Sequence, residues 1–134
     1  MTDPSLTVLQ VLPALETGGV ERGTVDMAEA LVAAGHRALV VSTGGSMVRQ
    51  LTRVGAEHVE LPVRSKNPLA IWRNIGRLAR LIETENVDLV HARSRAPAWS
   101  AMYAARRTKR RFVTTVHGAY GVGNRFKRAY NSVM

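Results

Sequence analysis

Two neighbouring glycines give this chain of 134 residues its first candidate for chemistry. The pair Gly18-Gly19 follows an apolar run over residues 7–12 and precedes a helical pattern. Glycines let backbone N–H groups approach a ligand closely, and the start of a helix points its free N–H groups at the same place. The pair therefore predicts a site for an anion such as a phosphate group. A tight turn without a ligand is the alternative.

Polar side chains at the ends of two predicted strands are the second set of candidates. His91 and Arg93 end one strand, and His117-Gly118 follows another. An arginine binds phosphate or carboxylate through two parallel hydrogen bonds, and a histidine exchanges a proton near neutral pH. We expect these residues to lie at a ligand site. The alternative for each is that it packs inside the protein or faces solvent and has no ligand.

Other kinds of site find no support in the sequence. The chain has no cysteine, so thiolate nucleophiles and cysteine-based zinc sites are excluded. The glycine spacing around Gly23 does not fit the dinucleotide-binding motif, and Ser42 stands where that motif needs an acidic residue. No metal-ligand spacing occurs on one helix. His36 and His58 fall at the amino-terminal side of their strands, so we expect both to be structural.

Positive charge is concentrated in the last third of the chain. Residues 1–88 hold nine Arg and Lys against all ten acidic residues, whereas residues 89–134 hold ten and no acid. This asymmetry predicts a polyanionic neighbour. The basic surface comprises a run at one helix end and three residues of a closing amphipathic helix: Arg106, Arg107, Lys109, Arg110, Arg111, Arg125, Lys127 and Arg128. The alternative for the run at residues 106–111 is a solvated helix end whose charges complement the helix dipole and bind no partner.

Nucleic acid and a membrane span are both disfavoured. The few aromatic residues lie mostly at core-like spacing, which leaves few platforms for base stacking. In the helix predicted over residues 69–85, for instance, Trp72 shares a stripe with apolar neighbours. No apolar run approaches the roughly 20 residues of a membrane span. We expect a cytoplasmic protein, with a peripheral position on the inner face of the cytoplasmic membrane as its variant.

Strands and helices alternate along the chain. The predicted strands cover residues 7–12, 36–42, 59–63, 87–92 and 112–116, and each connection between them contains a predicted helix. This predicts an α/β fold, a Rossmann-like parallel sheet with helices on both faces and the strand order 3-2-1-4-5. Ligand is then expected where the order reverses, over the loops at residues 16–20 and 92–97.

Four segments together resemble a known family. They are Gly-Gly-Val-Glu-Arg at Gly18, Leu-x-x-x-Gly-His ending at His36, Asp88-Leu-Val-His-Ala-Arg-Ser94 and Thr114-Thr-Val-His-Gly118. In order and spacing they are similar to the acceptor-side domain of GT4-like retaining glycosyltransferases of the GT-B fold. The resemblance covers about residues 7–130.

The resemblance implies roles for the candidate residues. Gly18 and Gly19 would lie near the donor diphosphate, and His117 would be the catalytic residue near the transferred sugar. The acceptor site would comprise His91, Arg93, Arg95 and Gly118. A nucleotide-sugar would be the co-substrate, with no further cofactor and no metal. The acceptor would be a lipid-linked or phosphorylated glycan, as in cell-envelope polysaccharide or lipopolysaccharide biosynthesis.

The resemblance also implies that the chain is part of a larger enzyme. Residues 1–134 are expected to form one incomplete N-terminal domain, whose intramolecular partner would be a C-terminal nucleotide-sugar domain absent from this sequence. Alone it would be inactive. Two alternatives stay open: a non-catalytic module that binds anions or docks on membranes, and a nucleic-acid-binding α/β protein.

Overall fold

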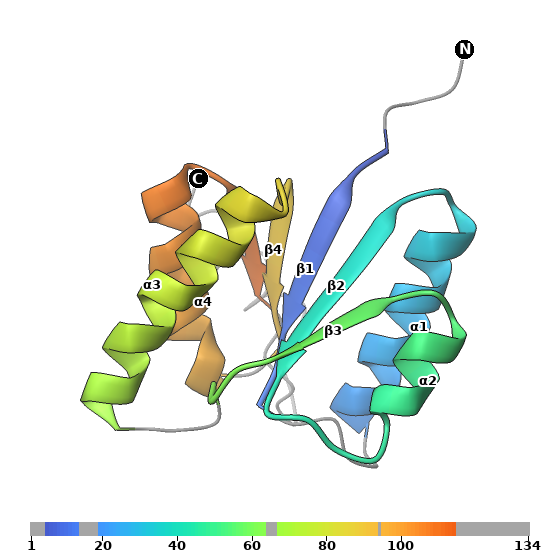
Figure 1. Ribbon diagram of the computed structural model, residues 1–134, viewed down its shortest axis with the longest axis horizontal. Helices are drawn as coiled ribbons and strands as arrows, with labels where there is room; N and C mark the ends of the chain where they lie inside the picture. Colours follow the sequence, from blue (N-terminus) through green and yellow to red (C-terminus); the bar gives the residue numbers. More distant parts are fainter. Residues whose placement is uncertain (1–4, 14–18, 64–66, 94, 115–134) are drawn as a thin grey trace, which may run out of the picture.

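A five-stranded parallel sheet forms the centre of the protein (Figure 1). The computed structural model describes residues 5–13, 19–63, 67–93 and 95–114. The sheet has the order β3-β2-β1-β4-β5, which confirms the predicted topology. Its strands are β1 (Thr7–Val11), β2 (Arg37–Ser42), β3 (Glu57–Glu60), β4 (Leu89–Ala92) and β5 (Arg111–Thr114).

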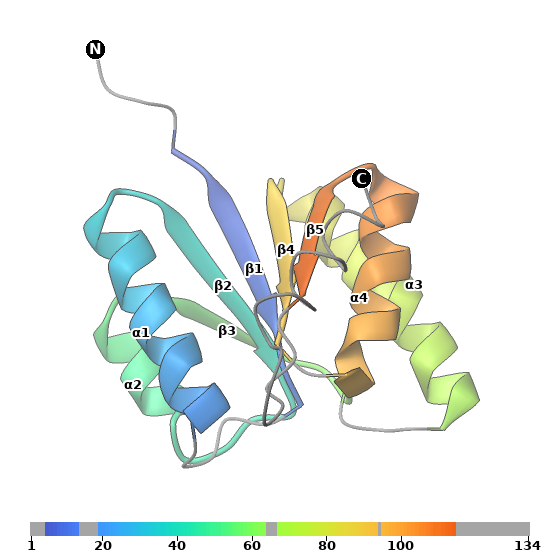
Figure 2. The ribbon, with the colours of Figure 1, turned by 180° about the vertical axis from the view of Figure 1, so that it is seen from behind.

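Helices cover both faces of the sheet. Figures 1 and 2 show α1 (Gly19–Ala33) and α2 (Val48–Arg53) on one face, with α3 (Pro68–Thr84) and α4 (Arg95–Thr108) on the other. Asn67 caps α3, since its side-chain oxygen accepts a hydrogen bond from the Leu69 N–H at 2.9 Å, and Pro68 fills the first helical position. The layers are those of a Rossmann-like domain.

Each face of the sheet has its own apolar core. Alternate residues of the central strands point to opposite faces, so Leu9 and Val11 pack toward α3 and α4. Val40 packs with Leu12 and Val25 on the α1 and α2 side. This two-sided burial explains why the central strands are continuous apolar runs.

An ion-pair cluster that sequence patterns did not indicate links β2, β3 and the end of α3. The Arg37 guanidinium donates to both carboxylate oxygens of Glu57, at 2.6 and 2.9 Å, and also pairs with Glu85. The hydrogen bond from Arg37 lowers the pKa of the Glu57 carboxyl. The cluster ties the short edge strand to its neighbours.

Three aromatic side chains lie outside the core. Trp72 is 71 % exposed, Trp99 59 % and Tyr103 45 %. The prediction that Trp72 shares the buried stripe of its helix is therefore wrong, and among the described aromatic residues only Phe112 is buried. Asn74, in the same turn of α3, is buried, as are Leu78 and Ile82, so it is the Trp72 side chain and not the whole turn that lies outside the core.

Two glycines provide a matched test of backbone conformation against packing. A Cβ atom added to Gly76, inside α3, or to Gly35, after α1, would meet no atom within 4 Å. Only Gly35 has a positive φ, +88°. We expect Gly76→Ala to raise the free energy of unfolding by about 0.5–1 kcal/mol and Gly35→Ala to lower it by about 1–2 kcal/mol. Urea titrations of both variants measure this, and changes of the same sign would contradict it.

Candidate anion site at the centre of the sheet

The strand order reverses between β1 and β4, which lie side by side in the middle of the sheet. Val11 pairs with Ala92, and the backbone N–H of Arg93 continues the ladder by donating to the Val11 carbonyl at 2.9 Å. Arg93 thus leaves the carboxyl edge directly at the switch point. In open parallel sheets ligands bind in the crevice at this position.

Arg93 turns from this edge toward α1. Its Nε donates to Oε1 of Gln10 at 2.6 Å, and Nε2 of Gln10 donates to the Thr24 carbonyl of α1 at 3.2 Å. The guanidinium also lies against Gly23, where an added Cβ would stand 3.3 Å from its Nη1. The structure therefore brings Arg93 to the first half of α1, as the expected ligand position requires.

The environment of Arg93 suits an anion. The side chain is only 7 % exposed, and burial lowers the pKa of its guanidinium. An arginine nevertheless stays charged in proteins. Within the described part of the chain Arg93 forms no ion pair. The amino-terminal end of α1 adds a partial positive charge. A buried guanidinium can bind a phosphate or a carboxylate through its fork of N–H donors.

Gln10 is a site residue that the sequence analysis missed. It is fully buried in β1 and pairs in register with Val40 on one side and His91 on the other. Its signal was present, because Gln10 is the single polar residue in the otherwise apolar run from Val8 to Leu12. His91 is 9 % exposed and lies beside Gln10 in the next strand, two residues before Arg93.

The other predicted site residues are only partly placed. Gly19 begins α1 and Arg95 begins α4, although the Arg95 side chain lies outside the described residues. Also outside are Gly18, His117 and Gly118, together with the closing basic residues Arg125, Lys127 and Arg128. The catalytic, donor-binding and acceptor-binding roles of these residues stay predictions.

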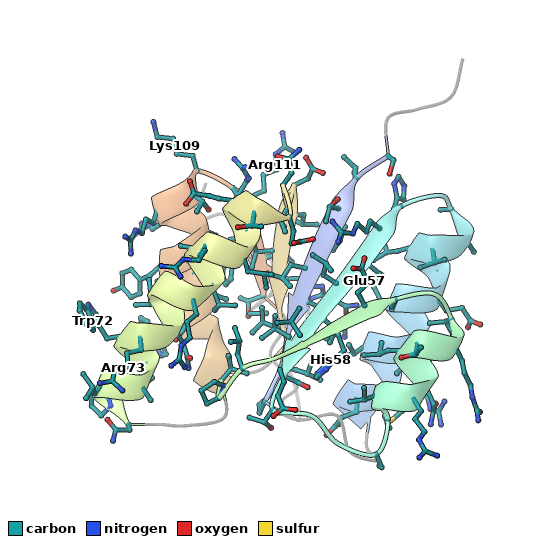
Figure 3. All side chains as sticks on the ribbon, viewed as in Figure 1. Glu57, His58, Trp72, Arg73, Lys109 and Arg111 are labelled. Atoms are coloured by element: carbon teal, nitrogen blue, oxygen red, sulfur yellow. The ribbon has the colours of Figure 1, made fainter. Side chains whose placement is uncertain are left out.

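The basic run from Arg106 to Arg111 lies at the other end of the sheet from Arg93. Arg106 and Arg107 form the last turn of α4, and Arg111 begins β5. Because the strands are parallel, the start of β5 belongs to the amino edge, where Figure 3 shows Lys109 and Arg111. The run therefore contributes no side chain to the candidate anion site.

His58 has a structural contact, as expected from its position. Its Nε2 lies 2.7 Å from Oγ of Ser42, and burial lowers the pKa of the imidazole below its ordinary value. Because the folded protein disfavours the charged imidazole, His58 binds a proton more readily in the unfolded chain. Protonation therefore lowers the free energy of unfolding.

The free energy of unfolding should therefore fall as the pH drops below about 6.5, the ordinary pKa of histidine. His58→Gln should show a weaker fall over the same range, because it removes the group that takes up the proton. Urea titrations of both proteins between neutral and acidic pH measure the difference. If the free energies of unfolding of the two proteins differ by the same amount at every pH, this role of His58 is contradicted.

The described residues hold neither a metal-binding cluster nor a helix that could cross a membrane. Among residues 5–13, 19–63, 67–93 and 95–114, no group of three or more His, Asp or Glu side chains could hold a metal ion. None of the helices in these ranges is long and apolar enough to cross a membrane.

Fold and site together define a Rossmann-like α/β domain with a buried cation at its switch point. Comparison with known proteins identifies the family. The model for Glycosyltransferase Family 4 matches residues 17–134, and the chain belongs to this family. No curated protein sequence matches the chain.

Solved structures extend this result. A glycosyltransferase from Rickettsia africae ESF-5 is 47 % identical, with a TM-score of 0.79, and the match covers 96 % of this chain but 34 % of that one. MurG from Acinetobacter baumannii is 18 % identical with a TM-score of 0.70, covering 92 % and 39 % of the two chains. The chain thus spans little more than a third of the length of these two proteins.

The fold alone does not define the activity. The C-terminal domain of a hydrogenase from Pyrococcus furiosus matches with a TM-score of 0.64 at 16 % identity, covering 81 % of this chain and 89 % of that one. At such identities a likeness shows the fold, and function depends on the residues of the site. The family match and the 47 % identical glycosyltransferase therefore carry more weight than the other likenesses.

Proposed function

We propose that this chain is the acceptor-binding part of a glycosyltransferase that transfers a sugar from a nucleotide-sugar to a phosphorylated or lipid-linked glycan. Membership of glycosyltransferase family 4 supports the reaction class. The observation that supports this kind of acceptor is the buried guanidinium of Arg93 at the switch point. Synthesis of a cell-envelope polysaccharide at the cytoplasmic face of the membrane is the setting that we propose.

The roles of the site follow from its geometry. Gln10 fixes the Arg93 side chain through Nε, so the two Nη groups keep a defined direction. A phosphate held by such a fork is positioned as well as bound, and positioning the acceptor is one main contribution of a transferase to the reaction rate. The nucleotide-sugar, by this proposal, is bound by a second domain and meets this chain at Gly18 and at Gly19, the first residue of α1.

Transfer by the whole gene product, with any sequence encoded after Met134, tests the proposal. Purified protein is given radiolabelled nucleotide-sugars with phosphorylated acceptors and with the same acceptors after phosphatase treatment. Transfer to the phosphorylated form, much reduced after dephosphorylation, is the expected result. Equal transfer to both forms would contradict the acceptor class and leave the reaction class intact. No transfer with any donor would contradict the proposed activity.

A further inference from the structure

Both tryptophans of the chain lie on the outer side of the α3 and α4 layer. Oγ of Ser100 in α4 donates to the Ile71 carbonyl of α3 at 3.2 Å, so the turns that carry Trp99 and Trp72 are neighbours. Leu69, which is 54 % exposed, belongs to the same end of α3. In Figure 3 Trp72 and Arg73 point away from the sheet. This outer face thus exposes apolar groups that no described residue covers.

Arginines line a hollow beside these aromatic residues. The hollow has a volume of about 710 Å³ and runs along α3 from Trp72 to Thr84. Arg73, Arg77 and Arg80 follow each other at helical spacing, and Arg107 of α4 contributes a fourth cation. Like charges at this spacing repel one another. Glu83 also lines the hollow, but the four arginines form no ion pair with any described residue.

We propose that this outer face of α3 and α4 docks on an anionic lipid bilayer. Tryptophan and tyrosine favour the headgroup level of a membrane, where one part of the ring system is apolar and another is wet. Arginines beside them pair with lipid phosphates, while exposed aliphatic groups such as Leu69 enter the acyl boundary. A surface that docks on a membrane requires arginines without an ion-pair partner, together with exposed aromatic and aliphatic groups.

Other occupants fit the face less well. Residues 115–134 contain three basic residues and no acid, so this segment would be repelled by the arginines. A nucleic acid strand needs free ring faces for base stacking. The rings of Trp99 and Tyr103 are stacked on each other, with centroids 6.5 Å apart, so each already uses one face.

This surface differs from the basic surface expected from the sequence. Only Arg107 belongs to both, because the remainder of the run from Arg106 to Arg111 lies at the helix end and the amino edge. The surface also lies on the opposite side of the sheet from α1, toward which Arg93 turns. The docking proposal and the acceptor proposal therefore rest on separate residues and can fail separately.

Tryptophan fluorescence tests the proposal without a label, because both tryptophans belong to the face. The chain is mixed with vesicles of phosphatidylcholine alone, or of phosphatidylcholine with phosphatidylglycerol. We expect a blue shift of the emission and co-sedimentation with the anionic vesicles only. Absence of binding, or equal binding to both vesicles, would overturn the proposal.

Charge-matched variants locate the contact. The triple variant Arg73→Gln, Arg77→Gln, Arg80→Gln should lower partitioning into anionic vesicles by about tenfold or more. The control Arg22→Gln, Arg49→Gln, Arg53→Gln removes the same charge from exposed positions of α1 and α2 and should change it less than about twofold. Circular dichroism verifies that both variants fold. Equal losses in both triples would overturn the assignment to this face.

A nucleic acid is tested as the competing partner. Fluorescence anisotropy with a labelled single-stranded oligonucleotide is measured over the same range of salt concentrations as vesicle binding. We expect the oligonucleotide to bind more weakly than anionic vesicles at every salt concentration. Tighter binding of the oligonucleotide, lost in the Arg73, Arg77 and Arg80 variant, would assign the face to nucleic acid instead.

Discussion

On the proposed function, Arg93→Lys in the whole gene product should raise the KM for a phosphorylated acceptor by roughly thirtyfold or more. The ammonium of lysine keeps the charge but offers neither the planar fork nor the Nε–H that donates to Gln10. Hydrogen bonds to charged groups contribute about 1.5–3 kcal/mol, and a loss of about 2 kcal/mol corresponds to roughly thirtyfold in affinity. The KM for the nucleotide-sugar should not change. Steady-state kinetics with each substrate varied in turn measure both values.

Two further variants separate binding from folding at this position. Gly23→Ala places a Cβ 3.3 Å from Nη1 of Arg93, so the guanidinium must shift by a few tenths of an ångström. Alanine favours a helix over glycine by about 1 kcal/mol. We expect a several-fold rise in acceptor KM without loss of stability. Arg49→Lys, at an exposed position of α2, is the control that should change neither. If Arg93→Lys only destabilises the fold and leaves the acceptor KM unchanged, Arg93 is a structural residue.

The 134-residue chain on its own should transfer no sugar at a measurable rate. The chain covers 34 % of the Rickettsia africae glycosyltransferase and 39 % of MurG, so it is much shorter than either protein. Bringing two substrates into reacting geometry supplies about 7–11 kcal/mol of the lowered barrier in well-oriented systems. We expect at most weak binding of a nucleotide-sugar. Scintillation counting of product after long incubation is the measurement, and turnover by protein free of contaminating enzyme would contradict the prediction.

The topology was predictable because each strand and helix has a local pattern. The apolar runs mark strands buried on both faces, and alternation with helices restricts the sheet to parallel crossovers, so the order followed. The edge strand was placed less well. Val59, Leu61 and Val63 alternate in sequence, but β3 runs from Glu57 to Glu60 and ends before Pro62, which has no N–H for the ladder.

The site was predictable only in part, for a physical reason. A residue at the carboxyl end of a central strand must lie near the switch point, so Arg93 could be found from its position alone. The hydrogen bond from Arg93 to Gln10 joins two residues that are 83 positions apart. No periodicity in the sequence indicates that their side chains point toward each other. Trp72 was misplaced because a helical stripe shows which residues share a face, but not how far the neighbouring layer extends over it.

The two cores of the sheet differ in size, and this bears on how the domain opens. Among the described residues, fifteen buried ones form the core under α3 and α4, whereas eight form the core under α1 and α2. Local unfolding of the smaller layer exposes less apolar surface, so the least costly partial openings of the native state release α1 and α2 first. An anion held between Arg93 and α1 would bind only the closed form and would suppress these openings. The weaker layer of the domain is thus the one whose persistence a bound ligand can control.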